Sequence, residues 1–313
     1  MYYRKNSVLL MLSVIFFSLF IILSCGKEST TPEETDQSVI FDLISAYPDI
    51  FCTCVIDTIP DSSGFGKIYG GDEDTVKFWW RRILWGQTKR SIDIDVHPLD
   101  LDHPYPYANV TVTDTLTGDL HLIKKAGPGN WSWSDKPITE VARRSAYFER
   151  RRPVDSSQRG WDLIEVSGLL IESLPTTREI DWIHIASTRT GYDTTITQSY
   201  ITGCTLIGNL LTFDEEDSVT VTVYTGDPTD SVYLHAYSRL FPHLFHVRRG
   251  FVNNGDGSFT GIWVTSQLKL GASPYRHAAI DVIKHGALDG DDPYDSKIWG
   301  VIYRIKILRF FRS

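Results

Sequence analysis

Apolar and polar side chains alternate along most of the chain after residue 91. Ile92, Ile94 and Val96 are separated by Asp93 and Asp95. Successive side chains of a β-strand point to opposite faces, so this period is typical of strands with one face in a core and one in water. The fold must therefore contain extensive β-sheet. The same alternation returns in residues 108–112, 219–223, 232–236, 259–264, 278–282 and 301–307.

Two segments before residue 90 have helical spacing instead. The first starts at Val39 and should end near Pro48, because proline removes a backbone donor. The second should follow an N-cap at Asp72 or Asp74 and continue for about three turns. We therefore predict two N-terminal helices. Their apolar stripes are Ile40, Leu43, Ile44 and Tyr47 in the first, and Val76, Trp79, Trp80, Ile83 and Leu84 in the second.

The order of elements predicts an α+β module over residues 39–174, with helices on one face of a curved antiparallel sheet. Two helices precede four long strands, and Gly160-Trp161-Asp162-Leu163 opens a late strand. This order resembles the nuclear transport factor 2-like cone fold, a family that also contains steroid isomerases and polyketide cyclases. The resemblance implies a cone-like sheet covered by helices.

The remainder, residues 175–313, is predicted to be an all-β sandwich. Its strands are separated by turn residues such as Gly226-Asp227-Pro228, and their spacing is typical of two packed sheets. The segment from Asn253 to Ser258 should be a hairpin turn, because its Asn-Gly and Asp-Gly steps favour positive φ angles. Residues 178–310 resemble immunoglobulin-like sandwiches, although they lack the intradomain cysteine pair.

The N-terminus has the features of an export signal. A charged start precedes an apolar run from Val8 to Leu23, which is short for a membrane span and suits a signal peptide. Ile22-Leu23-Ser24-Cys25-Gly26 resembles the lipobox of bacterial lipoproteins, which implies cleavage before Cys25. We predict a signal peptide at 1–24 and a flexible polar tether at 25–38. An uncleaved membrane anchor is the alternative.

The lipobox resemblance also implies a location. Acylation of Cys25 by two or more chains would hold the protein on a lipid bilayer, because one chain alone gives marginal binding. Gly26 stands where many proteins of the inner membrane carry aspartate. By this analogy we expect a protein of the bacterial cell envelope, with the outer membrane favoured and a cell-surface orientation left open.

Charge excludes nucleic acid as a main partner. The chain has 31 Lys and Arg against 39 Asp and Glu, a net charge of −8, and removal of the signal would take two positive charges with it. The longest basic run is Arg150-Arg151-Arg152. Nucleic-acid binding needs a larger basic surface than this.

Three cysteines lie beyond Cys25. In an oxidising envelope, Cys204 could bond to Cys52 or Cys54. Buried free thiols are the alternative that we favour. The Cys52-Thr53-Cys54 spacing lacks the second ligand pair of a zinc site.

The richest acidic segment lies between the last two predicted strands. Asp289, Asp291, Asp292 and Asp295 are candidate ligands for calcium, a cation that prefers oxygen. Their spacing does not match the twelve-residue calcium loop, and an ordinary loop at the end of the sandwich explains them as well. We therefore predict no cofactor and keep calcium as the alternative.

Two groups of residues in the N-terminal module are candidate pocket residues. Asp93, Asp95 and His97 share one face of a strand and would suit a general base if that face were buried. Ile92 and its apolar neighbours compete for the interior, which favours a solvated face for the charges. Trp79 and Trp80 would line an apolar pocket or pack in the core.

Nothing in the chain matches a nucleophile elbow, a phosphate loop or a zinc-protease motif. We therefore predict a non-catalytic binding or protein-interaction module, with an envelope protein or a small apolar ligand as its partner. Loops of the sandwich, including residues 285–297, would form the contact end. The alternative is a small-ligand carrier or an enzyme that uses a pocket in the N-terminal module.

Overall fold

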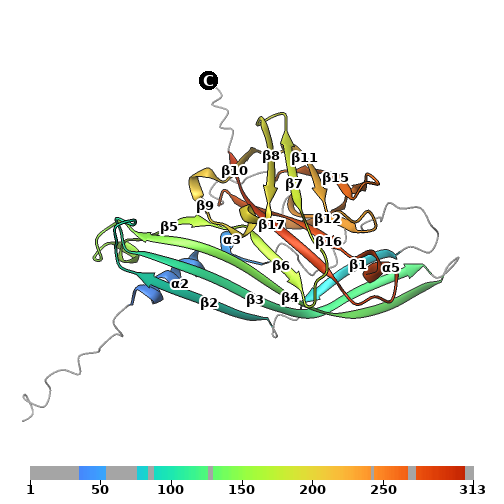
Figure 1. The fold of residues 1–313 in the computed structure, drawn as a ribbon, viewed down its shortest axis with the longest axis horizontal. Helices are drawn as coiled ribbons and strands as arrows, with labels where there is room; N and C mark the ends of the chain where they lie inside the picture. The colour runs from blue at the N-terminus through green and yellow to red at the C-terminus, as the bar shows by residue number, and fades with distance from the viewer. Residues whose placement is uncertain are drawn as a thin grey trace, which may run out of the picture.

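Strands dominate the computed structural model, which describes residues 35–53, 76–83, 88–125, 130–240, 243–266 and 273–306. Within these ranges the strands form one twelve-stranded and one five-stranded sheet (Figure 1). Pairing is antiparallel almost throughout, with β10 (Leu211–Asp214) and β17 (Ser296–Lys306) as a parallel pair. The signal peptide, Cys25 and Cys54 lie outside the described residues.

The predicted α+β class is wrong, because the second predicted helix is a strand. β1 (Val76–Ile83) pairs antiparallel with β3 (Tyr107–Lys125) and places Trp79 opposite Leu122. Trp79, Arg81 and Ile83 are all buried, as expected for positions two apart on one face of a strand. The buried arginine interrupts the apolar period of two, so the remaining apolar residues have a helix-like spacing.

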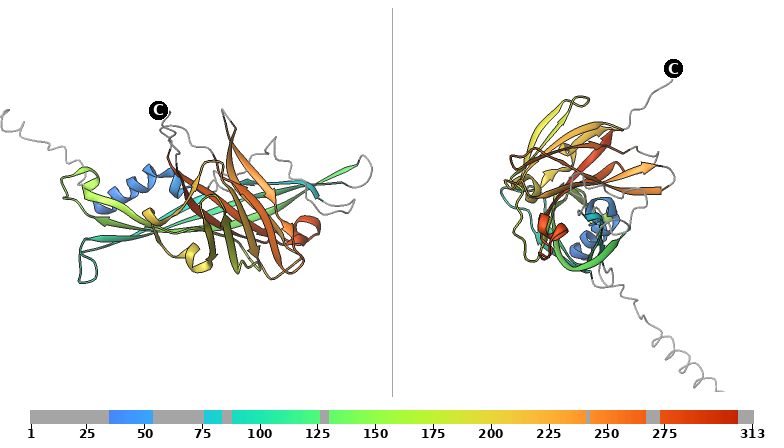
Figure 2. Two further views of the ribbon diagram at one scale, coloured as in Figure 1. Left: turned by 90° about the horizontal axis from the view of Figure 1, so that it is seen from above. Right: turned by 90° about the vertical axis from the view of Figure 1, so that its right-hand side faces the viewer.

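A long curved ribbon of two strands forms the spine of the N-terminal half. β3 pairs with β4 (Trp131–Arg150) from Tyr107 to Lys125, and the ribbon bends around the interior (Figure 2). The late strand predicted to open at Gly160-Trp161-Asp162-Leu163 is followed by a second strand, with Ser167 and Gly168 between the two. The partners of the ribbon are β2 (Lys89–His97) beside β3, and β5 (Trp161–Val166) and β6 (Leu169–Ser173) beside β4.

The first predicted helix is confirmed. α2 (Asp36–Ala46) and α3 (Pro48–Phe51) lie on the concave side of the curved sheet (Figure 2). Thr35 caps α2, since its hydroxyl accepts the Ser38 amide at 3.2 Å. The helix therefore begins inside the segment predicted as tether. Its buried residues pack with Phe148 and Trp161 in what we call the helix core.

The twelve-stranded sheet crosses residue 174, where the sequence predicts a domain boundary. β6 pairs with β17, and the sheet continues through strands of the C-terminal half. The two predicted modules therefore share one sheet. Its remaining strands are β16 (Tyr275–Ile283), β12 (Ser231–Leu240), β13 (His243–Gly250) and the short β9 (Thr205–Leu206) beside β5.

The predicted sandwich in the C-terminal half is confirmed. The five-stranded sheet packs on the C-terminal part of the large sheet and encloses a sandwich core that includes Val221, Trp263 and Tyr303. The predicted hairpin at residues 253–258 is present, with positive φ at Gly255 and Gly257. In order across the sheet, its strands are β14 (Val252–Asn253), β15 (Ser258–Val264), β11 (Ser218–Tyr224), β7 (Trp182–Ser187) and β8 (Tyr192–Thr197).

β17 is buried on both faces. Trp299, Val301 and Tyr303 point into the sandwich core, whereas Ile302 packs in the helix core. Ile298 belongs to a third cluster, the junction core, with Trp79, Leu122 and Ile171.

The short helical segments of the described ranges are η3 (Ser157–Gly160), α4 (Gln198–Thr202), η4 (Ile207–Asn209) and α5 (His285–Asp289). No helix in the described ranges is long and apolar enough to cross a membrane.

Candidate functional site

The predicted pocket residues of the N-terminal module do not come together. Trp79 is buried in the junction core, opposite Leu122 of β3. His97 of β2 lies opposite Tyr107 of β3. Tyr107 precedes Leu122, the partner of Trp79, by fifteen residues on β3. At 3.4 Å per residue the two positions are about 50 Å apart along β3. Trp80 lies in β1, but its side chain is outside the described part of the structure.

Asp93 and Asp95 are exposed on the outer face of β2. His97 is half-buried, and its Nε2 lies 2.9 Å from Asp95 Oδ2. Ile92, Ile94 and Val96 point the other way and pack against the helix core. The apolar face of β2 thus occupies the interior, and the ionisable face meets solvent.

The four acidic candidates for calcium separate to different partners. Asp289 pairs with His285 at 2.9 Å and Asp292 pairs with Lys284 at 2.8 Å. Asp291 is exposed, and Asp295 is buried beside Thr177. In the described residues, no group of three or more His, Cys, Asp or Glu side chains is placed to hold a metal ion.

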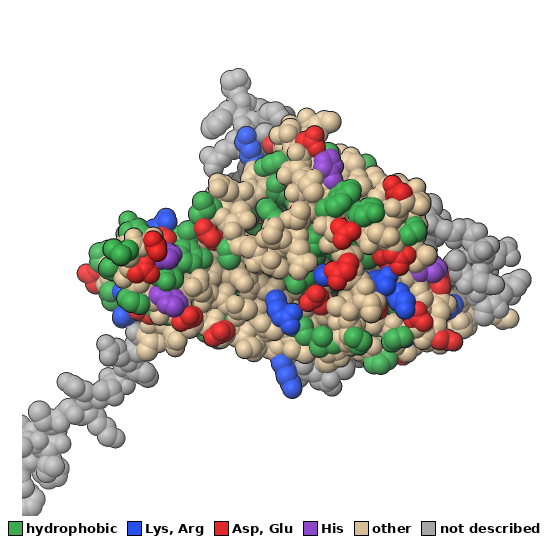
Figure 3. All heavy atoms as spheres, in the orientation of Figure 1, with side chains coloured by type: hydrophobic (Ala, Val, Ile, Leu, Met, Phe, Trp, Pro, Cys, Tyr) green, Lys and Arg blue, Asp and Glu red, His purple; other side chains and the backbone are tan. Residues whose placement is uncertain are grey.

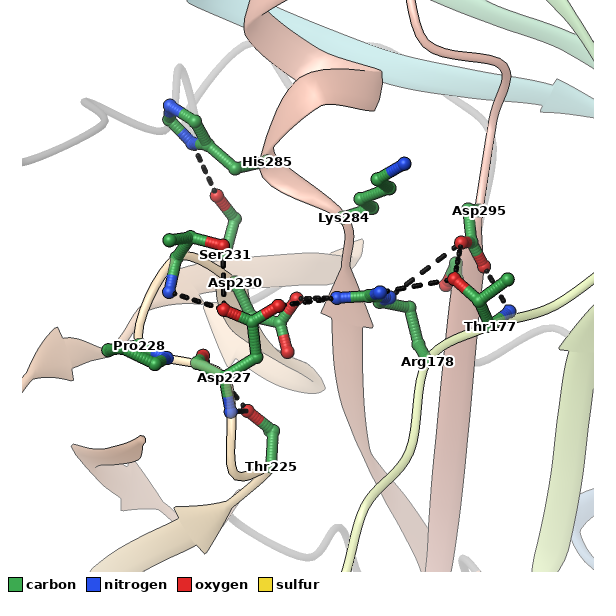
Figure 4. Close-up of polar contacts among 12 residues, drawn as sticks. Thr177, Arg178, Thr225, Asp227, Pro228, Asp230, Ser231, Lys284, His285 and Asp295 are labelled. Carbon is green, nitrogen blue, oxygen red and sulfur yellow. Dashed lines mark hydrogen bonds and ion pairs between the residues drawn. The ribbon is translucent and has the colours of Figure 1, made fainter. Parts of the chain in front are cut away.

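Asp295 belongs to a cluster that the sequence did not indicate, centred on Arg178 in the segment between β6 and β7. Arg178 Nη1 donates to Asp230 at 2.7 Å and to Asp227 at 3.0 Å, and Nε lies 3.7 Å from Asp295 (Figure 4). Burial raises the pKa of Asp230, although Arg178 opposes that rise. The cluster ties the β11–β12 turn to the start of β17, so we interpret it as structural.

We expect Arg178→Met to destabilise the protein by about 1–3 kcal/mol, because it leaves the nearly buried carboxylate of Asp230 without its cation. Urea unfolding of the two proteins measures the difference. Arg189→Met is the matched control, since the Arg189–Asp214 pair is more exposed and should be worth less than about 1 kcal/mol. Equal losses in both variants would contradict this interpretation.

A second charged cluster is fully buried in the junction core. Arg81 lies 2.7 Å from Asp281 and 3.3 Å from Glu140, and its guanidinium donates to the Tyr294 hydroxyl at 2.6 and 2.8 Å. His235 Nε2 lies 2.9 Å from Asp281 Oδ2. These residues come from both halves of the chain and are inaccessible to solvent. We therefore interpret this cluster as structural too.

A third polar group anchors α3. His277 contacts the Asp49 carbonyl oxygen through Nε2, and its Nδ1 lies 3.3 Å from Arg144 Nη2. Burial, with a further contribution from Arg144, lowers the pKa of His277 to about 3. The imidazole is therefore neutral in the folded protein at neutral pH.

The outer side of the five-stranded sheet is the best candidate for function. We call it the open face. Val219, Val221 and Val223 of β11 point into the sandwich core, so the alternate residues of β11 and its neighbours point outward. Two rows cross the open face side by side. One contains Trp182 and Tyr224, and the next contains Thr195, His184, Thr222 and Thr260.

A hollow of about 360 Å³ lies on this face, lined by Trp182, His184, Thr195 and Thr222. The Trp182 ring stacks on Tyr224, with centroids 5.5 Å apart and planes 8° from parallel. Asp193 holds one ring nitrogen of His184 at 2.6 Å, and the Thr222 and Thr260 hydroxyls lie 3.3 Å apart. The hollow thus combines one aromatic wall with three polar side chains.

Sequence patterns predicted β11 and β15 of the open face but not its site. The signal was present, since Trp182, His184 and Ala186 alternate with buried isoleucines. What the sequence lacked was the register that places β8 and β11 on either side of β7.

The surface of the molecule that is visible in Figure 3 carries acidic and basic side chains in small mixed groups.

Two of the cysteines lie among the described residues, and they differ in state. Cys52 is disulfide-bonded, whereas Cys204 is a free, exposed thiol. The bond from Cys204 to Cys52 or Cys54 that the sequence left open is therefore not formed. The favoured prediction of buried free thiols is wrong for Cys52, which is bonded, and for Cys204 it holds for the free thiol but not for its burial.

Comparisons with known proteins add little to this geometry. No family model and no curated protein matches the chain. Among solved structures, a pullulanase from Bacillus acidopullulyticus is similar with a TM-score of 0.17 and 11% sequence identity. That match covers 77% of this chain and 32% of the pullulanase, so the chain spans about a third of the length of that protein.

Proposed function

We propose that this protein is a lipid-anchored lipoprotein of the bacterial cell envelope that binds a saccharide on the open face without chemical conversion. The hollow beside Trp182 is the observation that carries the binding proposal. The lipobox-like segment around Cys25 supports the anchor.

The chemistry of the hollow favours a polyhydroxylated ligand. A sugar ring has an apolar C–H face and a rim of hydroxyl groups. The face of Trp182 is complementary to the first, because aromatic side chains offer a large rigid apolar surface. His184, Thr195 and Thr222 supply hydrogen-bonding groups for the second. Among the described residues of this lining, His184 alone is titratable, which suits binding better than acid–base catalysis by a pair of groups.

We expect Trp182→Ala to weaken saccharide binding at least tenfold, since it removes the aromatic wall of the hollow. Isothermal titration with maltotetraose, cellotetraose, chitotetraose and a disaccharide–peptide from peptidoglycan would measure this. Ile262→Ala is the control, because Ile262 is exposed on the same face outside the hollow lining. Absence of binding to all four probes, or unchanged affinity in Trp182→Ala, would reject the saccharide proposal.

The anchor has an independent test. We expect metabolic labelling with a fatty acid to mark the wild-type protein, and Cys25→Ala to lose the label. Retention of the label in Cys25→Ala would exclude Cys25 as the site of acylation.

A further inference from the structure

The loop at residues 98–106, which joins β2 to β3, carries two exposed leucines. Leu99 is 62% exposed and Leu101 is fully exposed. Asp100, which lies between them, is also exposed, and His103 is partly exposed. We call this segment the leucine loop.

Hydrogen bonds inside the leucine loop hold this arrangement. Asp100 Oδ1 accepts the backbone amides of Asp102 at 2.9 Å and His103 at 2.8 Å, together with His103 Nδ1 at 2.9 Å. The His103 ring stacks on Tyr107, with centroids 4.1 Å apart. The loop is therefore shaped by its own polar groups, and both leucines are left on its outer surface.

The leucine loop lies at the same end of the molecule as the start of α2 (Figures 1 and 2). Arg150 joins the two. Its backbone amide donates to the Pro106 carbonyl at 2.9 Å, and its side chain pairs with Asp36 at 3.0 Å. Asp36 also accepts hydrogen bonds from Arg159 and Trp161. The chain that enters α2 is thus tied firmly to the end that carries the leucines.

The tether limits how far this end can lie from a membrane. Thr35 lies ten positions after Cys25, and an extended chain of that length spans at most about 35 Å. Exposed leucines held within that distance of a lipid surface gain free energy when they enter it. The tether also raises the effective concentration of the loop at the surface, so a weak contact would be populated.

We infer that the leucine loop is a second membrane contact, in which Leu99 and Leu101 insert into the lipid surface that holds the acylated Cys25. This inference rests on the proposed lipid anchor. Since Asp102 is exposed beside the leucines, the contact should favour zwitterionic over anionic lipids. The molecule would then lie with its α2 end on the bilayer.

The test attaches the protein to vesicles by chemistry, so that it does not depend on natural acylation. A chain of residues 25–313 with Cys204→Ser, which removes the exposed free thiol, is coupled through Cys25 to a maleimide lipid in phosphatidylcholine–phosphatidylethanolamine vesicles. Peptide mapping verifies the coupling site. Hydrogen exchange is then compared between the coupled and the free protein.

We expect amides of the leucine loop to exchange about tenfold more slowly on vesicles, and Leu99→Ser/Leu101→Ser to lose this protection. The control Val252→Ser/Ile262→Ser removes two exposed apolar side chains from the other sheet and should keep it. Thermal unfolding verifies that both double variants fold. Equal exchange in the free and coupled wild type, or full protection in the leucine variant, would overturn the inference. Failure of natural acylation at Cys25, with protection of the loop retained on the vesicles, would reject the anchor and leave only the lipid affinity of the leucine loop.

Discussion

Arg81→Met is expected to lower the free energy of unfolding by about 3–5 kcal/mol, because removal of one partner leaves buried charges uncompensated. Arg81 is the cation between Glu140 and Asp281, and all three side chains are inaccessible to solvent. Methionine fills most of the volume but carries no charge. Two buried carboxylates would then lack their partner, and burial of an unpaired charge is costly.

The directions of the pKa shifts agree with this expectation. Burial raises the pKa of Glu140 despite the nearby guanidinium. In contrast, Arg81 and His235 hold the pKa of Asp281 well below its usual range, although burial opposes them. Without Arg81, the pKa of Asp281 should rise. Its protonation would limit the damage at acidic pH, so the loss should be greatest near neutral pH.

Urea unfolding at pH 7 measures the effect. Arg143→Met is the control on β4, where the half-exposed Arg143 pairs with Glu172 at 3.3 Å and should contribute less than about 1 kcal/mol. Arg81→Met/Glu140→Gln/Asp281→Asn should recover part of the loss, because it removes the uncompensated charges. A loss below about 1 kcal/mol for Arg81→Met would show that this cluster is not the electrostatic link between the two halves.

The second large effect is a loss of stability in mild acid that depends on His277. The pKa of His277 is about 3 in the folded protein and about 6.5 in an unfolded chain. Protons therefore bind preferentially to the unfolded state as pH falls from 6.5 toward 3, and stability is lost over that window. At about 1.4 kcal/mol per pH unit, the loss from pH 7.5 to 4.5 should be about 2–3 kcal/mol.

His277→Gln isolates this contribution. Glutamine can keep hydrogen bonds to the Asp49 carbonyl and Arg144 but cannot take up a proton, so stability should change less between pH 7.5 and 4.5. Urea unfolding across that pH range gives the free energy of unfolding against pH for the wild type and for His277→Gln. His184→Gln on the open face is the matched control, because it makes the same substitution at a partly exposed histidine. Parallel curves for the wild type and His277→Gln would mean that the folded protein accommodates the charged imidazole.

Sequence patterns predicted the elements whose burial is one-sided and apolar. β2 and β11 alternate cleanly, because each has one face in a core and one in water. α2 has four buried apolar residues at helical spacing and a threonine cap. The turn before β15 was predictable from its Asn-Gly and Asp-Gly steps, which favour the positive φ that Gly255 and Gly257 adopt. A Cβ at Gly257 would lie 2.9 Å from the Gly226 carbonyl carbon.

The failures share a physical cause, which is burial of charge or burial on two faces. β1 looked helical because Arg81 is a core residue, and its burial depends on Glu140 and Asp281, which are distant in sequence. The sheet shared across residue 174 was not visible in the sequence, because each half has an apolar pattern of its own. The shared sheet depends on β17, which supplies side chains to cores on both of its faces.

The candidate site divides in the same way. The sequence by itself determined that β11 is a strand with outward polar residues, because alternation is a local property of the chain. Only the tertiary structure decided that Trp182 stands beside Tyr224 and that Thr195, His184 and Thr222 lie in one row. Strand order and register arise from contacts between residues far apart in sequence, and no local pattern of the sequence encodes those contacts.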